Sequence, residues 1–143
     1  MTLTLICQLA EIGTCIATFA LAVVAWWQIA QIREQTATSF EDRLTEQYRK
    51  LMKDIPTDVW LGADLKTVPK EQQRRCRDAI YRYIDLSNEQ AFLHNVGRVR
   101  PETWRVWKEG IKSNMDLRAF DEVWKEVAHK TPEAFTFLRE LIP

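Results

Sequence analysis

Residues 12–32 read IGTCIATFALAVVAWWQIAQI and contain no charged side chain. Of the 20 basic and 20 acidic residues in the chain, only Glu11 precedes Arg33. In a helix that rises about 1.5 Å per residue, 21 residues cover roughly 30 Å, the thickness of a hydrocarbon core. Trp26 and Trp27 lie near the end of this stretch, where interfacial aromatic side chains gather, and Arg33 closes it. The stretch predicts a transmembrane helix within an anchor formed by residues 1–32.

Two other structures could explain an uncharged stretch of this length. A buried core helix is one, although such long uncharged segments are uncommon in small soluble domains. A cleaved signal peptide is the other, but residues 1–10 carry no Lys or Arg, and the run ends in Trp-Trp-Gln rather than in a small-residue cleavage site. A membrane anchor is therefore the preferred interpretation.

The charges that flank the stretch predict its orientation. Residues 1–10 contain no basic residue, whereas the C-terminal side carries Arg33, Arg43, Arg49, Lys50 and Lys53. Basic residues are retained on the cytoplasmic side of a membrane. We therefore expect a single-pass protein of the bacterial inner membrane, with its N-terminus outside and residues 33–143 in the cytoplasm.

One side of the predicted anchor is small and weakly polar. Its members recur in steps of three and four, which places them on one helical stripe. Small side chains allow helices to approach closely in lipid, so the stripe predicts packing against another membrane helix, from a partner or a second copy. Glu11 lies either at the solvated outer interface or against a basic group of another subunit. The stripe consists of Cys7, Glu11, Thr14, Cys15, Thr18, Ala22 and Ala25.

The remainder of the chain has helical periodicity and no sustained strand alternation. The anchor is expected to continue into an amphipathic helix that ends before Pro56, and a later helix is expected between Pro69 and Gly97. Pro101, Asp116 and Thr131-Pro132-Glu133 predict three further helix starts. The sequence thus predicts an all-α protein whose cytoplasmic domain, residues 33–143, is a compact bundle of four or five helices.

Composition and motifs argue against nucleic-acid binding, metal or cofactor binding, and catalysis. The net charge is zero, which disfavours a nucleic-acid binder. The three cysteines form no Cys-x-x-Cys pair, and the two histidines have no ligand spacing around them, so we expect neither a metal nor a cofactor. Asp85, Glu89 and His94 are the remaining catalytic candidates, and acids one turn apart are more often a solvated face. The prediction is a protein that is not an enzyme.

Two basic clusters accompany tryptophans in the predicted cytoplasmic domain. Near a membrane they could bind anionic lipid headgroups or an acidic partner, while the simpler alternative is pairing with acidic residues on the same helix surfaces. Trp104 and Trp107 alternate with basic residues and could form an aromatic and basic docking face, although packing in the core is the simpler interpretation. The candidates for partner or headgroup contacts are Arg74, Arg75, Arg77, Arg98, Arg100, Trp104, Arg105 and Trp107.

This layout resembles a group of uncharacterised small bacterial membrane proteins that have one span followed by a cytoplasmic helical domain. The similarity lies in WQIAQIREQT at residues 27–36 and, more loosely, in YRYIDL at 81–86 together with Trp104 and Trp124. The resemblance implies the same layout and transfers no site residues.

From these features we expect a membrane-anchored accessory or assembly subunit that binds integral membrane subunits of a larger respiratory, photosynthetic or transport complex. A self-associating membrane effector or sensor, for example in stress or phage defence, is the alternative. A membrane-tethered enzyme is the third candidate.

Overall fold

The computed structural model describes residues 2–142, with side chains for residues 18–32, 35, 36 and 38–142. Within these residues the chain is helical and contains no strand, which confirms the all-α fold class. The chain divides into two units, residues 1–38 and 39–143. Helix α1 (Thr2–Met52) contributes to both of them. The charge pattern had indicated a boundary after residue 32.

In the first unit, every described side chain from residue 18 to 32 is exposed. This group includes Thr18, Ala22 and Ala25 of the small-residue stripe, together with Trp26 and Trp27. No helix in the described part of the chain is long and apolar enough to span a membrane. Residues 12–17 of the predicted span lie outside the described side chains, as do four stripe residues and one interface residue: Cys7, Glu11, Thr14, Cys15 and Arg33.

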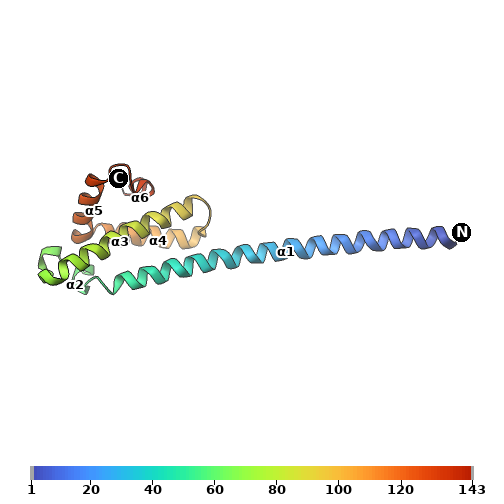
Figure 1. Cartoon of the computed structure of the whole chain (residues 1–143), viewed down its shortest axis with the longest axis horizontal. Helices are drawn as coiled ribbons and strands as arrows, with labels where there is room; N and C mark the ends of the chain where they lie inside the picture. The colour runs from blue at the N-terminus through green and yellow to red at the C-terminus, as the bar shows by residue number, and fades with distance from the viewer. Residues whose placement is uncertain (1, 143) are drawn as a thin grey trace. The chain divides into compact units, whose positions relative to one another are not determined.

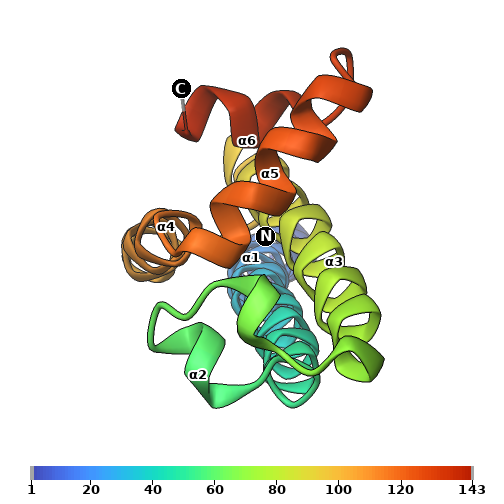
Figure 2. The same cartoon turned by 90° about the vertical axis from the view of Figure 1, so that its left-hand side faces the viewer.

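The second unit is a helical domain. Residues 39–52 of α1 lie beside α3 and α4, the two longest later helices (Figures 1 and 2). Helices α5 and α6 lie on the other side of α3 and α4 from α1 (Figure 1). Two short elements connect α1 to α3. The later elements are α2 (Thr57–Trp60), the 3-10 helix η1 (Leu65–Thr67), α3 (Lys70–Asn95), α4 (Pro101–Met115), α5 (Arg118–Lys130) and α6 (Thr136–Leu141).

Proline and glycine set the limits of α3 and α4 as the sequence predicts. Pro69 is the N-cap of α3, and Pro101 occupies the first position of α4, where a missing N–H costs nothing. After α3, Gly97 adopts a φ of 71°. Its N–H donates to the His94 carbonyl at 2.9 Å, and the Arg98 N–H donates to the Leu93 carbonyl at 2.8 Å. This pair of bonds is the Schellman arrangement that ends a helix.

Two predicted helix starts are wrong in detail. Asp116 is the C-cap of α4, and the N-cap of α5 is Leu117, because α4 continues to Met115 and leaves only a tight turn between the helices. The last helix starts at Thr136 rather than in the Thr131-Pro132-Glu133 segment. Phe135 precedes it with a φ of 58°, and this left-handed residue delays the helix start.

Helix α3 runs through the middle of the core. Six of its residues, which recur in steps of three and four, are buried, and aromatic rings from α1, α2 and α5 pack around Tyr83. Burial raises the pKa of the Cys76 thiol, so this cysteine stays protonated and acts as a small packing group. These six buried residues are Cys76, Ala79, Ile80, Tyr83, Ile84 and Ser87.

Two glycines provide a matched test of this backbone. Gly110 lies inside α4 without a positive φ, and a Cβ added there would meet no atom within 4 Å. Gly110→Ala should therefore raise the free energy of unfolding by about 1 kcal/mol, because glycine is entropically costly inside a helix. Gly97→Ala should lower it by about 1 kcal/mol, because alanine is strained at positive φ. Urea unfolding followed by tryptophan fluorescence measures both, and changes of the same sign would contradict these backbone assignments.

Candidate functional site

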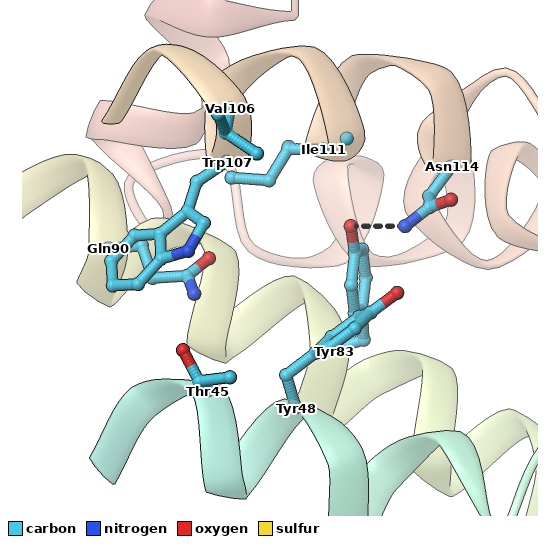
Figure 3. Close-up of a pocket in the computed structure, with 9 residues that line it drawn as sticks. Thr45, Tyr48, Tyr83, Gln90, Val106, Trp107, Ile111 and Asn114 are labelled. Carbon is cyan, nitrogen blue, oxygen red and sulfur yellow. Dashed lines mark hydrogen bonds between the residues drawn. The ribbon is translucent and has the colours of Figure 1, made fainter. Parts of the chain in front are cut away.

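A cavity of about 260 Å³ opens between α1, α3 and α4 in the helical domain. Side chains from all three helices face it (Figure 3). Its walls are largely aromatic and aliphatic, and none of its lining residues is charged. The lining residues are Thr45, Tyr48, Tyr83, Gln90, Val106, Trp107, Gly110, Ile111 and Asn114.

Aromatic and amide groups shape the two ends of this cavity. At one end, the Asn114 amide donates to the Tyr83 hydroxyl at 2.9 Å, and the Tyr48 ring lies 6.1 Å from the Tyr83 ring (Figure 3). At the other end are the side chains of Gln90 and Trp107 (Figure 3). The cavity therefore combines flat apolar walls with a few polar groups, as small-molecule sites do.

Burial raises the pKa of Tyr83 to about 12, although the hydrogen bond from Asn114 opposes this shift. In the unfolded chain the phenol should ionise near its ordinary value of 10.0. The unfolded state therefore loses a proton first, so the contribution of Tyr83 to stability is complete below about pH 10 and is lost as the pH rises towards 12.

Tyr83→Phe should remove this alkaline loss. Between about pH 10 and pH 11 the wild-type chain should lose up to roughly 1 kcal/mol more unfolding free energy than the variant, since one pKa unit corresponds to about 1.4 kcal/mol. Urea unfolding at a series of pH values measures the difference. Tyr81→Phe, at an exposed position on the same helix, is the control and should behave like the wild type. Equal alkaline losses in all three proteins would refute the burial argument.

Arg100 forms an ion pair within the domain, although 53 % of its side chain stays exposed to solvent. Glu41, on α1, is buried with only 4 % of its surface exposed. It accepts hydrogen bonds from the backbone N–H of Arg100 at 2.9 Å, from the Arg100 guanidinium and from the Thr103 hydroxyl at 2.9 Å. This cluster joins α1 to the start of α4. A partner that binds Arg100 would therefore contact a guanidinium group that is already paired with Glu41.

The other predicted arginine contacts fall into two groups. Arg77 pairs with Glu122 at 3.1 Å and with Glu126, both on α5, and Arg75 lies 3.3 Å from Asp54. The hydrogen bond from Lys130 and the charges of Lys130 and Arg77 hold the pKa of Glu126 below its ordinary value. The second group is exposed and has no ion-pair partner within the described residues. It contains Arg74, Arg98 and Arg105, of which Arg98 lies 5.8 Å from the Phe40 ring centre.

The candidate catalytic residues on α3 are not gathered into one site. Asp85 and Glu89 are exposed and line a shallow surface pocket with Lys50 and Arg82. His94 does not line that pocket. Its ring instead stacks on Trp104, with centres 4.7 Å apart and planes 13° apart. Within the described side chains, no group of three His, Cys, Asp or Glu residues is placed to hold a metal ion.

Trp107 is the one predicted contact residue that reaches the cavity. Gln90 was not predicted to be part of a site, although the sequence contains a signal for it. It follows Ser87 by three positions and Tyr83 by seven, so it falls on the apolar stripe of α3. A polar residue on a core stripe indicates either an internal hydrogen bond or a ligand contact.

No protein-family model, curated protein or solved structure matches this chain.

Proposed function

We propose that this protein is a membrane-anchored accessory or assembly subunit, with an anchor in residues 1–32 and a cytoplasmic helical domain in residues 33–143. The observation that carries the proposal is the exposed apolar surface of residues 18–32. Fifteen consecutive residues carry no charge, and the exposed fractions of Phe19 and Trp26 are 74 % and 79 %. Exposed apolar surface of this extent is typical of a lipid or protein contact.

Lipid is the better-supported environment for this surface, because apolar side chains occupy every side of the helix rather than a single stripe. The basic flank that begins at Arg33 favours a cytoplasmic location for the helical domain. Binding, rather than catalysis, is the proposed role of that domain, because its candidate acids and His94 are dispersed. The proposed partners are integral membrane subunits of a respiratory, photosynthetic or transport complex.

Membrane association can be tested by flotation of cell membranes on a sucrose gradient after a carbonate wash. The wild-type chain should float and be released only by detergent. Val23→Lys combined with Val24→Lys should reduce the floating fraction severalfold, since each central lysine costs about 3 kcal/mol of insertion free energy. Leu61→Lys, at an exposed position in the helical domain, is the control and should float. Release of the wild-type chain by carbonate alone would refute the anchor.

The accessory role can be tested by native purification of the tagged chain from its own membranes in mild detergent. Recovery of other membrane subunits in fixed stoichiometry would support the proposal. Recovery of this chain alone, as a discrete oligomer, would contradict it and support a self-associating membrane effector or sensor. Mass measurement of the intact complex distinguishes these outcomes.

A further inference from the structure

Gln90 presents an unpartnered amide to the cavity between α1, α3 and α4. Only 6 % of its surface is exposed, and its side chain has no hydrogen-bond partner among the described residues. Among the described side chains, the fully buried polar atoms without a partner are Trp60 Nε1 and His94 Nδ1. The Gln90 amide atoms therefore reach the open cavity, where one acceptor oxygen and two N–H donors are available. Because Gln90 lines the cavity, its amide is placed to bind a molecule that enters there.

The surroundings of Gln90 define the kind of molecule that fits. The Trp107 indole and the Tyr48 and Tyr83 rings provide flat apolar faces (Figure 3). Flat rings stack on such faces. The lining contains no charged residue that could pair with an ionic ligand. A volume of about 260 Å³ lies just below the usual range of ligand pockets, which start at about 300 Å³, so the ligand is small.

We propose that this cavity binds a small, neutral, planar heterocycle that offers an adjacent hydrogen-bond donor and acceptor to the Gln90 amide. Nucleobases and cyclic amides share this edge. A glutamine amide pairs with it through two hydrogen bonds, in the way that glutamine reads the N6 and N7 positions of adenine. The ring would stack against the aromatic wall. This binding function goes beyond the anchoring role and does not depend on it.

The full chain in mild detergent can be tested by saturation-transfer NMR with adenine and uracil as probes. We expect saturable binding of at least one probe. Gln90→Leu should weaken it by at least about tenfold, because both hydrogen bonds are lost. Gln47→Leu is the matched control, since Gln47 is an exposed glutamine outside the cavity lining, and should bind like the wild type. 6-Dimethylamino-9-methylpurine keeps the purine ring of 9-methyladenine but lacks the N6 donor, and the N9 methyl group removes the N9–H donor from both, so it should bind less tightly than 9-methyladenine.

A second variant leaves Gln90 intact. Gly110 lines the cavity, and a side chain added there has open space around its Cβ. Gly110→Leu should therefore occupy the site and abolish probe binding while the domain stays folded, as judged by circular dichroism. Gln90→Leu should also leave the unfolding midpoint unchanged or higher, because the Gln90 side chain forms no hydrogen bond with another described residue and leucine adds apolar surface to the cavity wall.

Three results would overturn this proposal. One is the absence of saturable binding by either probe up to about 10 mM, which corresponds to a very weak interaction. Another is binding that persists in Gln90→Leu or is equally tight for 6-dimethylamino-9-methylpurine and 9-methyladenine. The third is a large loss of stability in Gln90→Leu, which would assign Gln90 a structural role.

Discussion

Phe120→Ala should lower the free energy of unfolding of the helical domain by about 4 kcal/mol, the largest effect expected from a single substitution in this chain. Phe120 lies on α5 and is fully buried. Its ring centre lies 5.2 Å from that of Tyr83, with the planes at 89°, and 5.0 Å from that of Trp60. Truncation removes the transfer free energy of the ring and leaves a void among side chains from α2 and α3.

This loss is large relative to the total stability of the domain. Domains of this size are stable by about 5–15 kcal/mol, so a loss of 4 kcal/mol removes a large share of that stability. Urea unfolding followed by tryptophan fluorescence should show a lower midpoint with an unchanged slope. Phe120→Leu, which refills most of the space, should cost only about 1–2 kcal/mol.

Phe92→Ala is the matched control for Phe120→Ala. Phe92 is 42 % exposed, and its main aromatic neighbour is Phe137, at 5.3 Å between ring centres. Its truncation should cost about 1 kcal/mol, because much of its surface already contacts solvent. Equal losses at Phe92 and Phe120 would contradict the position of Phe120 at the centre of the core.

The sequence predicts most of the helical domain because its signals are local. Gly97 ends α3 and Pro101 begins α4 through backbone preferences that act within one turn. The buried stripe of α3 follows from periodicity alone. The start of α6 cannot be predicted from local signals in the same way. It depends on the left-handed conformation of Phe135, which the preceding Thr131-Pro132-Glu133 signal does not indicate.

The candidate site is harder to predict, since it depends on the packing of three helices. Gln90 is visible as a polar residue on an apolar stripe, but nothing in the sequence shows whether a partner lies opposite. The cavity exists because residues from α1, α3 and α4 meet around it. The aromatic character of Trp107 and its basic neighbours predict a docking residue, but not this cavity. Local patterns thus point to Trp107 alone among the predicted contact residues and do not show how the cavity is assembled.

Arg100 illustrates the same limit for charged residues. Its position among other basic residues predicts a surface contact, but nothing nearby in the sequence indicates its internal partner Glu41, which lies 59 positions earlier in the chain. Replacing Glu41 with glutamine should lower the free energy of unfolding by about 2 kcal/mol at neutral pH. Breaking a fully buried ion pair costs about 3–5 kcal/mol, and the smaller value follows from the 53 % exposure of the Arg100 side chain to solvent.

The difference in unfolding free energy between the wild type and Glu41→Gln should shrink at acidic pH. Burial raises the pKa of Glu41, but the hydrogen bonds from Arg100 and Thr103 together outweigh that effect and hold the pKa below its ordinary value of 4.5. A carboxylate whose pKa is lowered by folding stabilises the folded state above the unfolded pKa. This stabilisation is lost as the pH falls through the lower folded pKa. The wild-type advantage should therefore be complete at neutral pH and shrink below about pH 4.5.

Urea unfolding of both proteins across this pH range provides the measurement, because urea does not screen charges. Glu46→Gln is the control. Glu46 forms an exposed pair with Lys50 on α1, at 2.8 Å, and such solvent-screened pairs contribute little to stability. Thr103→Val should cost about 1 kcal/mol, because it removes one of the hydrogen bonds to Glu41. If the difference between Glu41→Gln and the wild type stays constant from neutral to acidic pH, the effect arises from altered packing and the ionised Glu41–Arg100 pair does not stabilise the domain.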